Sequence, residues 1–284
     1  MSRREVSSSL TEQVERLTAE SKARATAVSI HDLESGLRFS LRGDLWFHAA
    51  STIKVAVLLA LFRAVDEGRV RLDDSLHVRN RFFSAANGSP FQLNRDSDAM
   101  PELHQTIGQT AKVSALAEGM ISASSNLATN LLLDFVGVGY ARNVLRDAQV
   151  EGVELRRGVE DHAAHEKGMN NEASADGLMT LLSALRGNFL SSESKEQAIR
   201  ILLEQRFNSM IPAGVPPHAA VAHKTGEIST ACHDMGIVYL PEREPYIAVI
   251  LTEFDSEKEG RRETVAAISE AIYHSVIGMR GEIK

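Results

Sequence analysis

Strand-like segments lie near both ends of this chain, and helix-like segments fill the space between them. Apolar runs bounded by turn residues predict strands at residues 25–31, 37–42, 219–224, 235–240 and 246–253. Apolar residues at helical spacing predict helices at residues 7–22, 51–67, 113–121, 125–137, 139–149, 174–185, 192–205 and 258–276. This order favours an α+β fold. One antiparallel sheet would be built from the N- and C-terminal strands, flanked by helices and packed against an all-helical part.

The same order predicts how the chain is divided. We expect residues 1–50 and 210–284 to form an α/β part with the antiparallel sheet, and residues 51–209 to form a mainly helical part of one continuous structural unit. Residues 80–112 are polar and rich in turn residues, and residues 150–173 carry many charges without periodicity, so both are expected to be irregular. Long stretches of this kind are usually functional or mobile.

The composition excludes several classes of protein. With 284 residues, of which 43% are hydrophobic, the chain is long enough to bury a sizeable core. Its net charge of −7 argues against a nucleic-acid partner, and we expect no membrane span because none of its apolar runs approaches ~20 residues. Cys232 is expected to be a small buried residue. The first residues lack a signal-peptide pattern, so we expect a cytoplasmic protein, or a periplasmic or secreted one if a leader has been removed.

Three short motifs follow one another along the chain: Ser51-Thr52-Ile53-Lys54, Ser124-Ser125-Asn126 and Lys224-Thr225-Gly226. Together they supply a serine nucleophile, two lysines, a second serine and an amide, which are the groups that serine acyl transfer needs. Each motif alone is a weak signal, since Ser-x-x-Lys is expected about once by chance in a chain of this length. A second copy, Ser192-Glu193-Ser194-Lys195, is interpreted as a helix cap followed by a solvated lysine.

The first motif suits nucleophilic catalysis. Positions i and i+3 of a helix share one face, so Lys54 is expected to stand beside Ser51. Lys54 is followed by the run Val-Ala-Val-Leu-Leu-Ala-Leu, and burial in such surroundings lowers the pKa of an amine until it can act as a base. The N-terminus of the helix would also favour the oxyanion that forms when Ser51 attacks a carbonyl.

The other two motifs each have a structural and a functional interpretation. Ser124 and Asn126 precede an apolar helix and could cap it; alternatively, Ser124 passes a proton to the leaving group while Asn126 hydrogen-bonds the substrate and the lysine of the first motif. Lys224 and Thr225 could hold a substrate carboxylate at the end of a predicted strand. Gly226 would let the substrate approach the backbone closely, although an ordinary exit from strand to turn has the same letters.

In this order and on these elements, the three motifs resemble those of the class A β-lactamases and the related penicillin-binding serine hydrolases. The resemblance covers about residues 25–276, and it includes residues 119–133 and the pair His223-Lys-Thr-Gly and His233-Asp-Met-Gly. It implies a two-part fold with the active site between the sheet and the helical part. It also implies that the backbone N–H groups of Ser51 and Glu227 form the oxyanion hole.

The chain departs from the family pattern at the acid that activates the deacylating water. Class A enzymes carry this glutamate on a loop that usually reads Glu-x-x-x-Asn. The family spacing from the second motif leads to Glu160, but Ala164 stands four residues later. Glu166 is followed by Asn170, yet it lies close to the next helix, and Asp161 matches a more distant set of relatives. We rank Glu160 first and Glu166 second. All three acids could instead be solvated loop charges.

Other features depart from the pattern or lie near it. Ser125 occupies a position at which Asp is commoner in the family. His162 and His165 lie near acids in the same loop, but their spacing is loose and we expect no metal site. Three further histidines are expected to be structural, namely His48, His223 and His233.

The sequence thus predicts a serine hydrolase that forms an acyl-enzyme, with β-lactam hydrolysis as the expected reaction. We expect no cofactor, a small-molecule partner such as a β-lactam or an acyl-peptide, and a monomer. If no acid activates water, the chain would behave as a penicillin-binding D-alanyl-D-alanine peptidase or an esterase. A catalytically silent binding module that kept the fold is the alternative from another class of protein.

Overall fold

A five-stranded antiparallel sheet joins the two ends of the chain. The computed structural model describes residues 3–256 and 259–278. The strands lie in the order β10-β11-β12-β1-β2, and their bounds are β1 Ala25–Asp32, β2 Arg38–Leu41, β10 Ala220–Ile228, β11 Ala231–Tyr239 and β12 Tyr246–Glu253. N-terminal β1 pairs directly with C-terminal β12, from Ala25 opposite Glu253 to Asp32 opposite Tyr246. The expected α+β fold is therefore confirmed.

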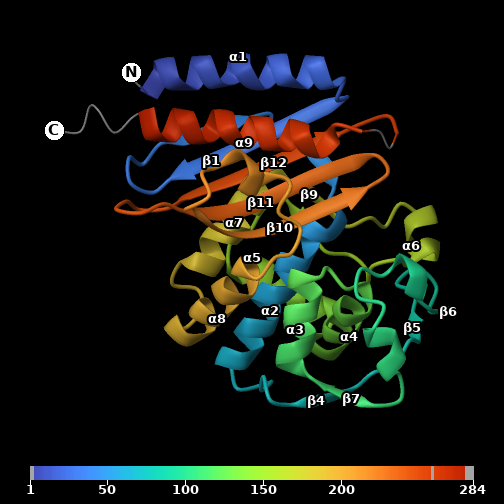
Figure 1. Ribbon diagram of the computed structural model, residues 1–284. Coiled ribbons are helices and arrows are strands. Elements are labelled where there is room, and N and C mark those ends of the chain that lie inside the picture. The colour runs from blue at the N-terminus through green and yellow to red at the C-terminus, as the bar shows by residue number, and fades with distance from the viewer. Residues whose placement is uncertain (1–2, 257–258, 279–284) are drawn as a thin grey trace.

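Two helices cover one face of the sheet. α1 (Arg3–Ser21) and α9 (Arg261–Gly278) lie side by side above the strands in Figure 1. Successive side chains of a strand point to opposite faces, and on this face Val28 and Ile30 of β1 join one apolar core with Leu10 of α1 and Ile268 of α9. The start expected for the last helix, Lys258, lies outside the described residues.

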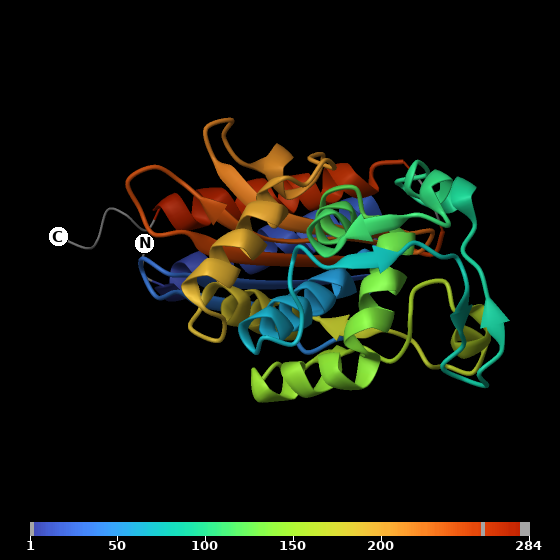
Figure 2. The ribbon, with the colours of Figure 1, turned by 90° about the horizontal axis from the view of Figure 1, so that it is seen from below.

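The helices of the middle segment cover the other face, which Figure 2 shows from below. α7 packs on β1 and β12, and α8 packs on β10. The helices of this part are α2 Lys54–Asp66, α3 Val113–Ser122, α4 Asn126–Val136, α5 Val138–Asp147, α6 His162–Glu166, α7 Ala175–Arg186 and α8 Ser192–Leu203. Ser174 and Ser191 cap α7 and α8, because their hydroxyls accept the N–H groups of Gly177 and Ser194. None of the described helices is both long enough and apolar enough to span a bilayer.

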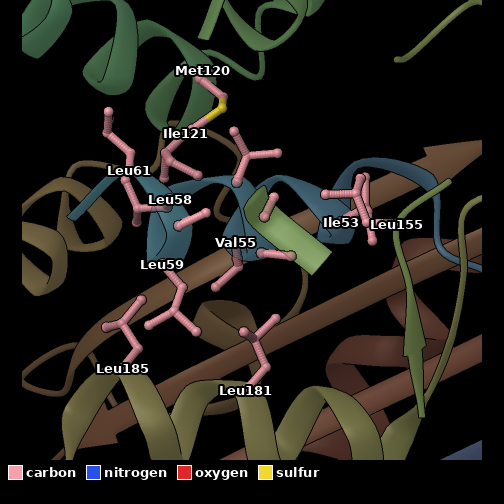
Figure 3. Close-up of a cluster of buried hydrophobic side chains, with 14 of the residues drawn as sticks. Ile53, Val55, Leu58, Leu59, Leu61, Met120, Ile121, Leu155, Leu181 and Leu185 are labelled. Atoms are coloured by element: carbon pink, nitrogen blue, oxygen red, sulfur yellow. The ribbon is translucent and has the colours of Figure 1, made fainter. Parts of the chain in front are cut away.

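Helix α2 runs through the centre of the helical part and is buried nearly all round, as expected. Figure 3 shows Leu58 and Leu61 directed towards α3, which carries Ile121, while Leu59 points towards Leu185 of α7. The start of this helix differs from the prediction. A 3₁₀ turn, η1 (Ala50–Ile53), precedes α2, so the serine of the first motif lies in that turn and its lysine is the first residue of the α-helix.

The two stretches expected to be irregular contain short ordered pieces. In residues 150–173 the prediction of a loop is wrong in part, because β8 (Val153–Glu154) and α6 fall within it. A small sheet in the order β3-β9-β8 contains β3 (Trp46–His48), β9 (Glu172–Ser174) and β8. Residues 80–112 hold β5 (Phe82–Phe83), β6 (Pro90–Phe91), η2 (Arg95–Ser97), η3 (Leu103–Thr106) and β7 (Thr110–Lys112), the last of which pairs with β4 (Ser75–His77). Elements of two or three residues are too short to show a period.

The strand that carries the third motif is longer than predicted. The prediction placed the strand end at Lys224, but β10 continues to Ile228 and stays paired with β11, with Gly226 opposite His233 and Ile228 opposite Ala231. Glycine here marks a close backbone approach within a strand and not a strand end. The third motif therefore lies inside the sheet, on its edge strand β10.

Candidate active site

Ser51 lies between two neighbouring hollows in the surface. The smaller hollow has a volume of about 220 Å³ and is also lined by Ser124, Phe207, Thr225 and Arg262. The larger hollow has a volume of about 490 Å³ and is also lined by His48, Arg157, Glu160, His162 and His165. Ser51, Asn126 and Glu227 line both hollows. The half-buried serine is therefore open to a ligand from either side.

Gly226 lets strand β10 approach the turn that holds the serine. A Cβ atom added at Gly226 would lie 3.1 Å from the backbone nitrogens of Ser51 and Thr52, and 3.0 Å from the Thr52 methyl group. These contacts are tighter than ordinary Cβ contacts, so a larger residue would push the strand and the turn apart. The next residue along β10, Glu227, thereby lies at the cleft beside Ser51.

The amine of Lys54 is fully buried and makes three short contacts with the second motif. Its Nζ lies 2.6 Å from the Ser124 carbonyl oxygen, 3.1 Å from Ser124 Oγ and 2.7 Å from Asn126 Oδ1. Residues i and i+3 eclipse each other in a 3₁₀ turn, and the Lys54 N–H donates to the carbonyl oxygen of Ser51. Burial, followed by the nearby charge of Lys224, lowers the pKa of Lys54 well below its ordinary value.

The amine of Lys224, on strand β10, also contacts Ser124. Its Nζ donates to Ser124 Oγ at 3.0 Å and to the Thr225 carbonyl oxygen at 2.8 Å. Burial lowers the pKa of Lys224 to about 7, although Asp234 opposes this shift. Ser124 has a φ of 59°, a conformation that costs free energy for a residue other than glycine. The hydroxyl of Ser124 thus stands between two amines, one from α2 and one from β10.

Of the three candidate acids, Glu160 lies at the cleft. Its Oε1 accepts a hydrogen bond of 2.6 Å from Asn126 Nδ2 and lies 3.5 Å from Ser97 Oγ. Its backbone has a φ of 59°, so the chain holds the carboxylate there in a conformation that is rare for glutamate. Glu160 and Ser51 line the same larger hollow.

The other two acids lie elsewhere. Asp161 is buried and caps α6, because its Oδ1 accepts the Ala164 N–H at 3.1 Å and its Oδ2 accepts the Ala85 N–H at 2.8 Å. Glu166 is exposed at the C-terminal end of α6. The geometry therefore gives Asp161 a structural position and leaves Glu160 as the acid nearest to the motifs.

The histidines that were expected to be structural are engaged in the fold. His223 lies 3.0 Å from Asp234 Oδ1 and 3.0 Å from Asn208 Oδ1. His233 lies between the His48 carbonyl oxygen and the Thr252 N–H, each at 3.1 Å, and burial lowers its pKa to about 4, so it stays neutral. Across the described residues, His, Cys, Asp and Glu side chains form no group of three or more that could hold a metal ion.

Two features of the cleft were missed in the sequence. Arg262, near the start of α9, lines the smaller hollow, and its guanidinium lies 2.7 Å and 2.9 Å from the Glu227 carboxylate. Asp98, from the middle of residues 80–112, is a buried carboxylate at the N-terminus of α4. An isolated Asp in a polar stretch carries no pattern that could have marked it.

Comparison with known proteins gives concordant matches over nearly the whole chain. Residues 9–276 match the family described as "Beta-lactamase enzyme family". Beta-lactamase ROB-1 of Haemophilus influenzae is 25% identical over 256 residues, which cover 88% of this chain and 79% of that protein. Beta-lactamase BRO-1 of Moraxella catarrhalis is 24% identical over 252 residues, with 84% and 76% covered.

Solved structures agree with these matches. The structure of PBP-A superposes with a TM-score of 0.81 at 27% identity, covering 95% of this chain and 96% of that one. A mutant of PBP-A, described as an acyl-enzyme complex with penicillin-G, has the same TM-score and identity. An ancestral class A beta-lactamase superposes with a TM-score of 0.80 at 25% identity, covering 94% and 99% of the two chains.

Proposed function

Because the chain belongs to the beta-lactamase enzyme family, as the three motifs predicted, we propose that it hydrolyses β-lactams through an acyl-enzyme on Ser51. One observation carries this proposal. The amines of Lys54 and Lys224 meet at Ser124 Oγ, at 3.1 Å and 3.0 Å, beside the open cleft that Ser51 lines. Both amines are buried, unlike those of lysines on the protein surface. They can accept and donate the protons that catalysis by a serine nucleophile requires.

In the acylation step, Ser51 Oγ attacks the lactam carbonyl carbon and its proton passes to the neutral Nζ of Lys54. Burial favours the neutral amine, which makes it a competent base. The carbonyl oxygen becomes an oxyanion, and the backbone N–H groups of Ser51 and Glu227 stabilise it. The carbon–nitrogen bond then breaks, and the ring nitrogen receives a proton through Ser124, which both lysines contact.

The remaining motif residues bind the substrate. Asn126 contacts both Lys54 and Glu160, so its amide lies where it can orient the acyl side chain. Thr225 lines the smaller hollow, and the buried Lys224 lies behind Ser124, which lines the same hollow. We assign the substrate carboxylate to Lys224 and Thr225, with Gly226 permitting the close approach of β10. An amine whose pKa is lowered to about 7 gains the charged form when a carboxylate binds beside it.

Deacylation is assigned to Glu160. In the larger hollow its carboxylate stands on the same wall as Asn126, from which it accepts a hydrogen bond. A water between Glu160 and the ester carbonyl would lose its proton to the carboxylate and attack the carbonyl carbon, and Ser51 would leave with a proton returned to it. This step separates a β-lactamase from a protein that only binds penicillin.

One observation favours the penicillin-binding peptidase as a second candidate. The residue four positions after Glu160 is Ala164, a fully buried alanine, and an alanine side chain cannot help Glu160 to hold a water. Slow deacylation would then leave the acyl-enzyme intact after penicillin binds. The two functions share acylation of Ser51 and differ only in the lifetime of the ester.

The direct test is turnover of nitrocefin, a chromogenic β-lactam. We expect hydrolysis by the wild-type chain and its loss in Ser51→Ala. Ser192→Ala is the matched control, since Ser192 begins the second Ser-x-x-Lys sequence, on the exposed start of α8, and it should keep full activity. Equal turnover by Ser51→Ala and the wild type would refute the proposal. A wild-type protein that binds one equivalent without turnover would select the peptidase.

A further inference from the structure

Asp98 places a buried negative charge behind the second motif. Its side chain has no exposed surface. Oδ2 accepts the N–H of Leu127 at 2.8 Å and lies 3.3 Å from Ser125 Oγ and 3.2 Å from His104 Nε2. Oδ1 accepts the N–H of Met100 at 2.9 Å. Four hydrogen-bonding neighbours thus hold the Asp98 carboxylate in place, and the N-terminus of α4 favours its negative charge.

This carboxylate contacts the serine in the middle of the second motif. Ser125 caps α4 by accepting the Ala128 N–H at 3.1 Å, and its hydroxyl proton is then directed towards Asp98. An acid at position 125 would bring a charge from within the motif. Here the charge arrives from another segment, 27 residues earlier in the chain.

The location of Asp98 also couples the cleft wall to the motif. Its two neighbours in sequence, Ser97 and Ala99, line the smaller hollow, whereas Asp98 itself points away from that hollow and into the protein. Ser97 Oγ lies 3.5 Å from Glu160. A single anchored carboxylate therefore fixes the wall on one side and the turn that holds Ser124 on the other.

We propose that Asp98 is a positioning residue for acylation: it holds the Ser124–Asn126 turn against the amine of Lys54, and so makes residues 80–112 part of the working site. This inference rests on the proposed function, because the acylation it refers to is that of Ser51 by a β-lactam. Asp98 touches no substrate-lining surface itself, so it acts through the turn and through its charge.

The charges around Lys54 come from several elements. Lys224 of β10 disfavours the charged amine, whereas Asp98 and Glu160 favour it, with Asp98 the stronger of the two. Asp234 of β11 acts on Lys224, and His104 of η3 lies beside Asp98. Removal of the Asp98 charge should therefore lower the pKa of Lys54 further.

The test does not require turnover. Lysine labelled with carbon-13 at Cε reports each amine by NMR, and the Lys54 signal is identified by its absence in Lys54→Met. In Asp98→Asn, which keeps the shape of the side chain, we expect the Lys54 titration to move to lower pH and the Leu127 amide to exchange faster. Asp96→Asn, an exposed acid on the same segment, is the matched control and should change neither. An unmoved Lys54 titration in folded Asp98→Asn would overturn the inference.

A second variant keeps the inference testable if Asp98→Asn does not fold. Ser125→Asp combined with Asp98→Asn returns one carboxylate to the start of α4, and we expect it to fold with the Lys54 titration near that of the wild type. Failure of this double variant to restore folding or the titration would contradict the inference. Where the wild type is acylated by benzylpenicillin, Asp98→Ala should also slow acylation by roughly tenfold to a hundredfold, because small displacements of reacting groups have effects of that size. Absence of acylation in the wild type would count against the proposed function alone.

Discussion

At the scale of single residues, the chemistry depends on two lysines that the fold keeps out of water. Lys54 and Lys224 are both fully buried, yet neither has a carboxylate as its direct hydrogen-bond partner among the contacts described above. They share the oxygen atoms of Ser124 and its neighbours instead. Burial of a cation without a paired anion costs free energy, so the two amines are held in a state that favours loss of a proton.

Lys54 should be indispensable for acylation. In Lys54→Met the hydrophobic stem is kept and the base is lost, so we expect kcat/KM for nitrocefin to fall by about 10²–10⁴-fold, the usual contribution of a positioned general base. Lys195→Met is the comparison variant, because Lys195 occupies the same place in the second Ser-x-x-Lys sequence, on α8. A Lys54→Met protein with undiminished kcat/KM would assign the base to another group.

Sequence alone could predict part of this residue-level picture. Spacing places Lys54 one turn from Ser51, and the apolar run after it predicts burial. The third motif could be placed near the first two only through the family resemblance, because Lys224 is 100 residues from Ser124. Asp98 could not be found, since its role depends on which distant N–H groups it meets.

At the scale of elements, the site depends on how closely β10 approaches the η1 turn. Gly226 is the point of contact, where an added Cβ atom would lie only 3.0–3.1 Å from atoms of Ser51 and Thr52. Sequence predicted the strand but not its full length, because the glycine was interpreted as a strand end. The ladder with β11 continues past it, and pairing between strands is a tertiary property that local propensity does not determine.

Gly226→Ala tests whether catalysis depends on the close approach of β10 to the η1 turn, and a second glycine variant controls for the general effect of replacing glycine by alanine. The added methyl group would displace the Ser51 backbone nitrogen, so we expect kcat to fall at least about tenfold while the fold is retained. Gly139→Ala is the control, because a Cβ atom at Gly139 in α5 meets no atom within 4 Å, and alanine favours helices. Steady-state kinetics and circular dichroism measure the two effects. Unchanged kcat in Gly226→Ala would show that the strand need not approach the turn so closely.

At the scale of the whole molecule, the site lies where the sheet meets the helical part. α2 and α4 supply Lys54 and Asn126, and β10 supplies Lys224. Sequence predicted this α+β architecture because strands at both ends and helices between them admit few arrangements. The small β3-β9-β8 sheet was beyond such reasoning because β3 pairs with a strand that lies far away in the sequence. The ordered pieces in residues 80–112 were beyond it because each is too short to show a period.

Global stability should depend on pH through Lys224. In the unfolded chain this amine titrates near 10.5, and in the fold its pKa is about 7. Below about pH 7 the fold must bury the charged amine, so the full cost is present; from pH 7 towards 10.5 the unfolded chain binds more protons, and stability rises. We therefore expect Lys224→Met to gain more stability relative to the wild type at pH 6 than at pH 9. Urea denaturation at both pH values measures this. An equal difference at both values would contradict the lowered pKa.

The central claim is that a β-lactam acylates Ser51 Oγ, and mass spectrometry of the intact protein tests it most directly. Glu160→Gln treated with benzylpenicillin should gain the mass of one antibiotic molecule, and digestion should locate that mass on the peptide that contains Ser51, while Ser51→Ala gains none. A stable adduct on another residue, or the same adduct on Ser51→Ala, would contradict the account.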